Sequence, residues 1–574
     1  MLFSRTKSLV STLCLATAVT AVGACASNKM DGFSNEDWQR VTDIIPLGTE
    51  MKPNPFDVRG DDEAVARFGQ RLFFDKRAAE AILVDGPSGK AAYSPIDPAT
   101  GMPVIDPVTM KAKVIPGEVG KVSCAICHGS TYLVDSRPYP ISHGRNWLAH
   151  NTPTMANLGY LKSFLWTGRL DSLREHGTGA LGGAATLMAG LHFIANNHLD
   201  EYNTLFPNTP LDAAAIADTT RFPLTGGVKG AATVNGKTIM NADGVFEKMS
   251  KADQWTVHQF RGNMGIVFEA HPRKLLTPGS KFEQYVRSED PTALSDKAKN
   301  GLRLFIGKAS CIDCHNGPAL TDNQYHNVGV PTQKAFPPGS ATPGAPDRGR
   351  GGVLTAGLNN ALMTLRTNDA MTDPTDQVAI MGGAGQYSDD PIQGRQRILD
   401  SDAATCLQHS TDVNDVTPAC QALFFPGSPE DATKTPPTPA KPADPRLQVC
   451  IDRNMASTGV CIKYTDEFEG SFRTPMLLNV AETGPYFHTG EYNTLRDVVN
   501  HYNQGGGLPG SFVGVKSPRL RPLGLTDSEV DDLVEFLKSL TGKVPDPNWM
   551  CDPALPPAAA GVAAVAGGPC AAPN

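Results

Sequence analysis

The residues in this sequence that are best suited to chemistry form two copies of the pattern Cys-x-x-Cys-His. Their members are Cys124, Cys127 and His128 in the first copy, and Cys311, Cys314 and His315 in the second. Two thiols three residues apart can form thioethers to both vinyl groups of one porphyrin, and the adjacent His can bind its iron. A bare Cys-x-x-Cys could instead be half of a zinc site or a redox-active disulfide, but neither explains a His after both pairs. The pattern therefore predicts two covalently bound haem c groups, with His128 and His315 as proximal iron ligands.

Helices are expected to hold both sites. Residues 64–74 and 295–306 carry apolar side chains at helical spacing ahead of the two motifs, and residues 255–268 form a further candidate. The segment Gly-Gln-Arg-Leu-Phe at 69–73 recurs as Gly-Leu-Arg-Leu-Phe at 301–305. We interpret this as two copies of one helical unit, each built around a site, with a loop inserted at 75–123 in the first copy.

The C-terminal part of the chain carries a separate helix signal. Thr526 and Glu529 have the spacing of a capping box, and apolar residues at helical spacing follow as far as Gly542. We therefore expect a helix that begins at this box.

The N-terminus has the features of an export signal. Arg5 and Lys7 precede an apolar stretch, Leu9–Val22, that is too short to span a bilayer and ends in a sequence resembling a bacterial lipobox. We expect a lipidated Cys25, a periplasm-facing protein and an anchor in the outer membrane. The alternative is an ordinary secretory signal cleaved nearby. No other segment is apolar and long enough to cross a membrane, so membrane contact is expected only through the lipid.

The remaining cysteines are expected to form disulfides, because the compartment is oxidising. Cys551 and Cys570 would hold an exposed tail rich in Pro, Ala and Gly. Residues 320–465 are mostly loop by composition, and cysteines within them would brace that loop. The pairing is open among Cys406, Cys420, Cys450 and Cys461.

Length and charge limit the class of protein. The 574 residues, 40% of them hydrophobic, suffice for two or more buried cores. The formal net charge is −8, and no basic stripe is present that could bind phosphates. These features argue against nucleic acid as a partner.

From about residue 60 to 545, the order of landmarks resembles the bacterial di-haem cytochrome c peroxidase and MauG family. The landmarks other than the first haem motif are Arg71-Leu72-Phe73-Phe74-Asp75, Asn151-Thr152-Pro153-Thr154, Trp166-Thr167-Gly168-Arg169, Cys311-Ile312-Asp313-Cys314-His315-Asn316-Gly317-Pro318 and Pro485-Tyr486-Phe487-His488-Thr489-Gly490. The resemblance implies a mainly α fold: two cytochrome c-like helical haem domains with long disulfide-braced loop insertions. In that family one haem reacts with peroxide and the other relays electrons.

Together with the terminal features, the resemblance divides the chain into five parts. These parts are a signal peptide (1–25), an N-terminal tether (26–60), a first haem domain (61–285, with the loop at 75–123), a second haem domain (286–545, with an insertion at 320–465) and a tail (546–574).

Several site residues follow from the resemblance. His143 matches the distal histidine that ligates the first haem at rest and leaves on activation, although read alone it is a loop histidine. Trp166 matches the tryptophan between the haems, and it could equally be a buried core residue. Asn151, Thr483 and Pro485 match a calcium site at the domain interface, where oxygen atoms suit a hard cation.

The sixth ligand of the second haem departs from the peroxidase pattern. Tyr502 stands where peroxidases have Met and MauG-like members have Tyr, and tyrosinate would favour a higher iron oxidation state. Tyr502 also lies on an apolar helix face, where it could simply pack, and His501 is a competing ligand.

The distal acid–base group also differs from the family pattern. The family places a glutamate, which moves protons during O–O cleavage, where this chain has Thr186. A different alignment would offer Glu175, His176 or His192 instead.

Three functions remain open. The first is reduction of hydrogen peroxide with electrons from a small cytochrome c or a copper protein (cupredoxin). The second is a MauG-like enzyme that stores oxidising equivalents on both haems and oxidises a protein or organic substrate. The third is a non-enzymatic electron-transport protein whose first haem stays capped by His143. A homodimer is a candidate assembly for any of them.

Overall fold

The computed structural model describes part of the chain, and all structural statements below concern that part. The described residues are 30–45, 58–75, 77, 92–93, 115–116, 123–129, 131–135, 150–168, 170, 173–174, 176–177, 187–226, 230–234, 237–242, 244–246, 248–288, 290–331, 347–349, 469–564 and 566–571. They are mainly helical with little strand, as the sequence predicts.

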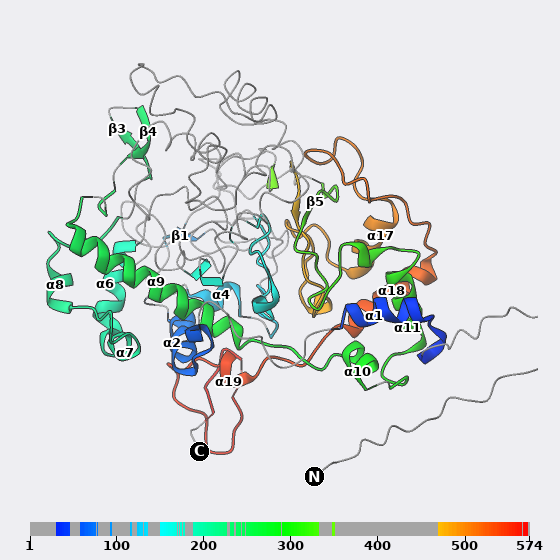
Figure 1. Ribbon diagram of the computed structural model, residues 1–574, viewed down its shortest axis with the longest axis horizontal. Helices are drawn as coiled ribbons and strands as arrows, with labels where there is room; N and C mark the ends of the chain where they lie inside the picture. The colour runs from blue at the N-terminus through cyan, green and yellow to red at the C-terminus, as the bar shows by residue number, and fades with distance from the viewer. Residues whose placement is uncertain are drawn as a thin grey trace, which may run out of the picture.

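The helices fall into two groups that lie side by side (Figure 1). The first group is α2 (Glu63–Phe74), α4 (Cys124–Cys127), α6 (Leu187–Asn197), α7 (Leu199–Leu205), α8 (Ala213–Ala217) and α9 (Lys251–Arg273). The second group is α1 (Asn35–Asp43), α10 (Lys281–Arg287), α11 (Asp296–Ile306), α17 (Leu495–Asn503) and α18 (Asp527–Ser539). A last short helix, α19 (Pro547–Met550), returns to the first group.

Short elements connect these helices. The 3-10 helices are η1 (Met30–Gly32), η2 (Val58–Asp61), η3 (Leu158–Tyr160), η4 (Cys311–Asp313) and η7 (Val480–Glu482). The strands pair antiparallel, β1 (Ala92–Tyr93) with β2 (Ile115–Pro116), β3 (Gly230–Val234) with β4 (Lys237–Ala242), and β5 (Tyr325–His326) with β6 (Phe472–Arg473). The last pair joins two segments far apart in the sequence beside the second haem motif.

The repeated glycine of the sequence lies where two helices cross in each group. Gly69 on α2 packs so closely on α9 that a side chain there would overlap the carbonyl oxygen of Val267. Gly301 on α11 packs in the same way on α18, where a side chain would overlap the carbonyl oxygen of Asp532. Only glycine permits such close approach, so the repeat marks the same helix crossing in both groups.

Each group has its own hydrophobic core. The first core gathers residues of α2, α6 and α9, including the fully buried Phe68 and Phe260. The second gathers residues of α10, α11, α17 and α18, including Phe305 and Phe536, whose rings lie 5.1 Å apart. Phe164, from the first half of the sequence, joins this second core. The two cores agree with a two-unit organisation, while the exact domain bounds remain a prediction.

Two asparagines link the groups through one threonine. Asn157 and Asn479 both have positive φ, near +60°, and both donate a side-chain hydrogen bond of 2.6 Å to Oγ1 of Thr277. All three residues are buried. The threonine therefore fixes equivalent positions of the two halves against each other.

The N-terminal segment differs from the expected tether. Ser34 caps α1, and Phe33, Val41 and Ile44 are buried in the second core. Asp31 accepts a 2.9 Å hydrogen bond from the hydroxyl of Tyr285. The apolar face of this helix holds it against α10 and α11, so residues 30–45 are part of the second helix group (Figure 1).

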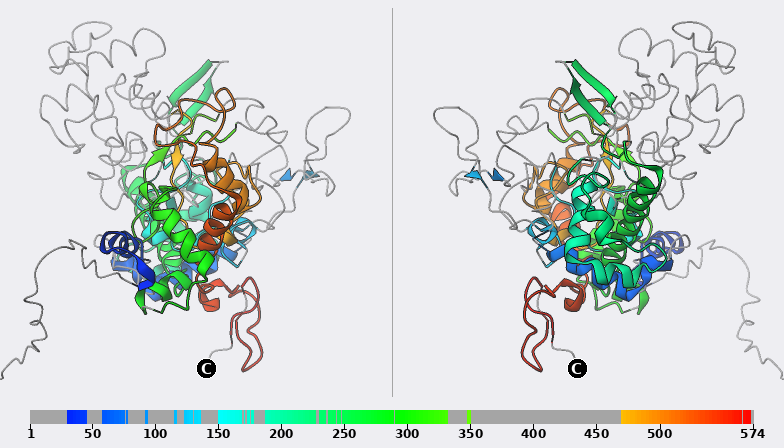
Figure 2. Two further views of the ribbon diagram at one scale, coloured as in Figure 1. Left: turned by 90° about the vertical axis from the view of Figure 1, so that its right-hand side faces the viewer. Right: turned by 90° about the vertical axis from the view of Figure 1, so that its left-hand side faces the viewer.

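The C-terminal segment is only partly an exposed tail. Trp549, Met550 and Cys551 are buried against the first helix group, while most residues from Leu555 to Val562 are exposed. The predicted disulfide between Cys551 and Cys570 is present. Figure 2 shows the loop that it closes projecting below the helices. The first part of this segment therefore runs from the second helix group to the first and packs on it.

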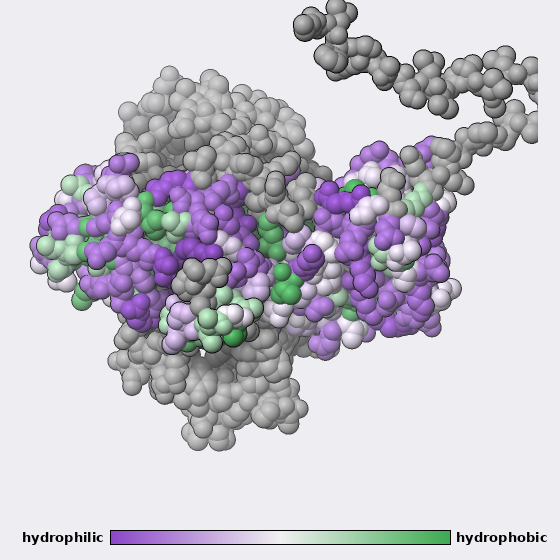
Figure 3. Space-filling model, turned by 90° about the horizontal axis from the view of Figure 1, so that it is seen from below, coloured by the Kyte–Doolittle hydropathy of each residue, from purple (hydrophilic) through white to green (hydrophobic). Residues whose placement is uncertain are grey.

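The predicted helices are confirmed with small changes in their bounds. The capping box of Thr526 and Glu529 is present at the start of α18. The helix expected at 255–268 extends over 23 residues as α9. Cys25 and the four cysteines at 406, 420, 450 and 461 lie outside the described residues. Within the described part, no helix is long and apolar enough to cross a membrane, and the described surface in Figure 3 is mostly hydrophilic.

Candidate haem sites

The two Cys-x-x-Cys-His motifs adopt the same local structure. The cysteines lie on one helical turn, α4 or η4, and the backbone N–H of the histidine donates to the carbonyl of the first cysteine at 3.0 Å for His128 and 2.9 Å for His315. In each motif, Nδ1 of the histidine lies at hydrogen-bond distance from the carbonyl of a leucine five residues later, 3.1 Å for Leu133 and 3.0 Å for Leu320. Both leucines have positive φ, so the loop turns back beneath the imidazole.

These hydrogen bonds determine which ring nitrogen of each histidine is suited to bind iron. A carbonyl oxygen can only accept, so Nδ1 carries the hydrogen and Nε2 keeps its lone pair. Burial lowers the pKa of both His128 and His315, which keeps the imidazoles neutral. A second hydrogen bond that fixes the tautomer is typical of histidines that bind metals. The four motif cysteines form no disulfide. The residues present therefore fit covalently attached haem.

Each motif faces a cavity. The first, of about 880 Å³, is lined by Cys124, Cys127 and His128 together with apolar residues such as Leu158 and Phe268. The second, of about 300 Å³, is lined by Cys311, Cys314 and His315. Both are mostly apolar, as expected of a site for a porphyrin.

Trp166, Arg473, Pro475 and Phe487 line both cavities and form the wall between them. The indole N–H of Trp166 donates to the carbonyl of Asn151 at 2.8 Å, and the carbonyl of Trp166 accepts from the backbone of Arg473 at 2.7 Å. Burial lowers the pKa of Arg473 to about 10, so the guanidinium stays charged at neutral pH. The wall thus presents an oxidisable ring and a positive charge to both cavities.

His488 is the counterpart of Trp166 in the second half of the chain. Each residue comes thirteen positions after the proline of a Thr-Pro pair, Pro153 or Pro475, and each precedes Thr-Gly. The carbonyl of His488 accepts from the backbone N–H of Asn151 at 2.7 Å, which mirrors the bond between Trp166 and Arg473. The two rings lie 6.4 Å apart. The repeat therefore places two aromatic side chains in contact between the cavities.

The imidazole of His488 is fully enclosed. It stacks on Phe472 with ring centroids 3.5 Å apart and an angle of 14°. Burial lowers its pKa to about 3, so the ring is neutral. Next to it, Nε2 of His150 lies 2.7 Å from Oδ2 of Asp347. A carboxylate and three imidazole or aromatic rings thus meet at one edge of the wall.

Tyr502 and His501 have different surroundings. Tyr502 lines the second cavity with His315, and burial raises the pKa of its phenol above the usual range. His501 turns away, with Nε2 at 2.8 Å from the carbonyl of Val328 and Nδ1 at 3.1 Å from the hydroxyl of Tyr492. Both of its ring nitrogens are occupied. Of the two candidates, the geometry favours Tyr502 as the ligand.

Two positions considered for the distal acid–base group, Glu175 and Thr186, lie outside the described residues, as does His143, the expected distal ligand of the first haem. Of the two that are described, His176 lines the first cavity and is exposed. His192 is buried with Nε2 at 2.8 Å from the carbonyl of Phe222, and it does not line the cavity. His176 is therefore the better placed of the two, and the identity of the distal group stays a prediction.

The three residues of the expected calcium site all line the first cavity. They are Asn151, Thr483 and Pro485. Oxygen donors suit calcium, and the site itself stays a prediction.

Sequence reasoning missed His488, Arg473 and Tyr492 as parts of the site, and it considered His501 only as a ligand competing with Tyr502. A signal for the first was present, because the stretches Trp-Thr-Gly and His-Thr-Gly follow Thr-Pro at equal distance in the two halves. The sequence around the other residues gives no sign of their place in the site. They meet only when β6 and α17 pack around the second cavity.

Comparisons with known proteins agree with this arrangement. Residues 117–291 match the family described as di-haem cytochrome c peroxidase. Cytochrome-c peroxidase IdrP1 of Denitromonas iodatirespirans is 24% identical over 83% of this chain and 94% of its own length. The cytochrome c551 peroxidase of Pseudomonas aeruginosa is 23% identical over 56% of this chain and 80% of its own. Methylamine utilization protein MauG of Methylophilus methylotrophus is 23% identical over 37% of this chain and 52% of its own length. The resemblance seen in the sequence is thereby confirmed.

Proposed function

We propose that this chain, a peroxidase-like oxidoreductase related to the di-haem cytochrome c peroxidases and MauG proteins, reduces hydrogen peroxide with electrons from a small cytochrome c or cupredoxin. The observation that carries the proposal is the shared wall: Trp166 lines both cavities, and each cavity is also lined by a motif histidine whose Nδ1 is held by a backbone carbonyl. Two redox groups separated by one oxidisable ring can act together.

When bound, the haems supply the iron at which peroxide is reduced and a store for the second electron. The chain's own residues do the rest. His128 and His315 would hold the irons through Nε2, since the carbonyls of Leu133 and Leu320 fix the tautomer of each imidazole. Trp166 is held in place by Asn151 and provides the contact between the cavities. The apolar lining of the first cavity excludes bulk water.

The first cavity is the better place for peroxide. It is the larger of the two, and exposed His176 lines it. The second cavity is lined by both His315 and Tyr502, so we assign Tyr502 as the sixth ligand there. His143 would ligate the first haem at rest and leave on activation.

A MauG-like oxidation of a protein or organic substrate is the second candidate. Tyr502 favours it, because a phenolate ligand stabilises a more oxidised iron than methionine does. The ring contact between Trp166 and His488 would also help both haems share oxidising equivalents.

Three further assignments belong to the proposal. A calcium ion at Asn151, Thr483 and Pro485 would brace the wall between the cavities. Lipidation at Cys25 would hold the protein at the periplasmic face of the outer membrane. The proposed assembly is a homodimer.

The test is peroxide turnover by the half-reduced protein with reduced small cytochrome c, recorded with visible and EPR spectra. Rapid oxidation of the donor, with one haem becoming high-spin on half-reduction, is the expected result. Oxidation of an organic substrate in preference to the cytochrome would favour the MauG-like candidate. No turnover with both irons low-spin would leave only electron transport.

A further inference from the structure

The strongest feature outside the haem wall is a hydrogen-bonded tyrosine and histidine behind the second cavity. The hydroxyl of Tyr492 lies 3.1 Å from Nδ1 of His501. Tyr492 is partly exposed and is followed by the exposed Asn493 and Thr494, whereas His501 is 5% exposed. The pair therefore connects the interior beside the second cavity with the protein surface.

The direction of this hydrogen bond is fixed by the other ring nitrogen. Nε2 of His501 lies 2.8 Å from the carbonyl of Val328, which can only accept, so Nε2 carries the hydrogen. In the neutral imidazole Nδ1 is then an acceptor, and the Tyr492 hydroxyl donates to it. Oxidation of a phenol releases its proton, so a phenol that already donates to an imidazole is poised for this loss.

A continuous set of ring contacts joins this pair to the second cavity. Phe487, which lines both cavities, lies 6.1 Å from Tyr502 and 5.4 Å from Tyr492, measured between ring centroids. His501 also contacts Tyr502, at 5.7 Å. These separations are those of packed aromatic pairs.

The backbone at Phe487 supports the same conclusion. Phe487 has φ of 64°, a conformation that bulky residues rarely adopt and that surrounding structure must stabilise. Its neighbour Tyr486 donates a 2.7 Å backbone hydrogen bond to the carbonyl of Tyr492. The strained turn is thus held in the position that places one ring between Tyr502 and Tyr492.

We propose that Tyr492 is a redox-active tyrosine that passes electrons from a one-electron donor at the surface to the second haem site. In the first step Tyr492 gives one electron to the site after oxidation by peroxide, and its phenolic proton moves to Nδ1 of His501. This leaves a neutral tyrosyl radical and an imidazolium. In the second step the donor returns one electron, and the proton moves back from His501. The inference rests on the proposed function for its oxidant.

The test uses the holo protein and two ways of oxidation. Flash-generated tris(bipyridine)ruthenium(III) oxidises exposed residues without peroxide, and hydrogen peroxide oxidises the protein through its haems. EPR after freeze-quenching then detects a neutral tyrosyl radical. The variants are Tyr492→Phe, His501→Gln, which keeps a polar side chain but cannot take up the proton, and the control Tyr160→Phe. Tyr160 is also partly buried, with Glu283 and Arg287 as charged neighbours.

The expected result is a tyrosyl signal in the wild type and in Tyr160→Phe, its loss in Tyr492→Phe and its loss or rapid decay in His501→Gln. Unchanged visible spectra would show that all variants fold and keep both haems. A signal that survives undiminished in Tyr492→Phe, or no tyrosyl signal in the wild type, would overturn the assignment.

The two oxidants separate this inference from the proposed function. If peroxide leaves the haem bands unchanged while the flash gives a signal that Tyr492→Phe abolishes, the peroxidase proposal fails and the assignment of Tyr492 stands. If peroxide is consumed at full rate but neither oxidant produces a radical at Tyr492, the peroxidase proposal stands and the assignment fails.

Discussion

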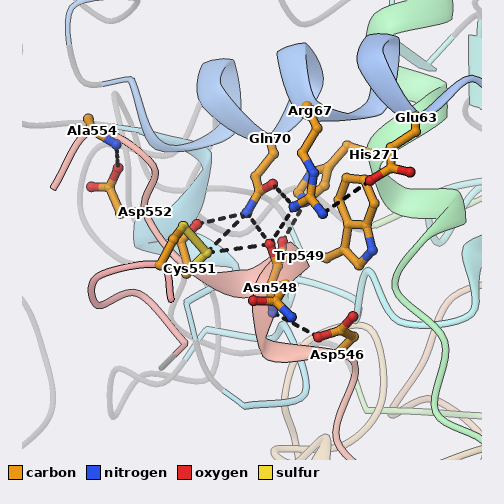
Figure 4. The surroundings of a disulfide bond; sticks show 11 residues. Glu63, Arg67, Gln70, His271, Asp546, Asn548, Trp549, Cys551, Asp552 and Ala554 are labelled. Atoms are coloured by element: carbon orange, nitrogen blue, oxygen red, sulfur yellow. Dashed lines mark hydrogen bonds and ion pairs between the residues drawn. A yellow bond between two sulfur atoms is a disulfide. The ribbon is translucent and has the colours of Figure 1, made fainter. Parts of the chain in front are cut away.

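Removal of the C-terminal disulfide should destabilise the first haem unit rather than the second. Figure 4 shows the surroundings of this bond. The side-chain amide of Gln70 on α2 donates to the carbonyls of Asn548 and Cys551, and the Arg67 guanidinium lies 3.5 Å from the centre of the Trp549 ring. The segment next to the disulfide is therefore attached to α2.

The size of the expected loss in the free energy of unfolding follows from the length of the loop that the disulfide closes. Cys551 and Cys570 are 19 residues apart. In the chain-entropy model a loop of this length contributes about 3 kcal/mol to the free energy of unfolding. For a unit of this size the melting temperature should fall by roughly 6–12 °C.

The assay is unfolding of Cys551→Ala/Cys570→Ala followed at the absorption bands of the two haems. Val562→Ala is the control, because Val562 lies in the same loop and is 52% exposed. This control should change the free energy of unfolding by less than about 0.5 kcal/mol. A double variant within about 1 kcal/mol of the wild type, or an equal loss in both haem units, would refute the reasoning.

Three further predictions follow from the same structure. Tyr502→Met should change the spectrum and reduction potential of one haem only, and unchanged spectra of both would exclude Tyr502 as a ligand. Thr277→Val leaves the amides of Asn157 and Asn479 without their acceptor, so denaturant titration should show a loss of roughly 2–4 kcal/mol, and a neutral variant would contradict the link between the halves. Cys25→Ser should abolish incorporation of labelled palmitate, whereas retained label would place the lipid elsewhere.

The haem motifs could be predicted from the sequence because their chemistry is local. Thiol spacing and the adjacent histidine lie within five residues in each motif. The capping box at Thr526 is equally local. Features of this kind depend on short-range sterics and hydrogen bonding, which a sequence displays directly.

The parts that were missed depend on contacts between distant segments. Nothing near Phe33 and Val41 shows that α1 packs on the second core instead of forming a tether. The same holds for Trp549, which follows the second helix group in the sequence but is buried in the core of the first group. The choice between Tyr502 and His501 also needed the structure, because it depends on the carbonyl of Val328, far away in the sequence.

The central claim is that each Cys-x-x-Cys-His motif holds its own haem, and the mass of the intact denatured chain tests it most directly. Because thioether bonds survive denaturation, the account predicts a mass increase of two haem groups. Cys124→Ala/Cys127→Ala should keep one haem, at the peptide containing His315, and Cys311→Ala/Cys314→Ala should keep the other. A chain that carries one haem or none when haem c maturation is active, or haem at any other peptide, would contradict the account.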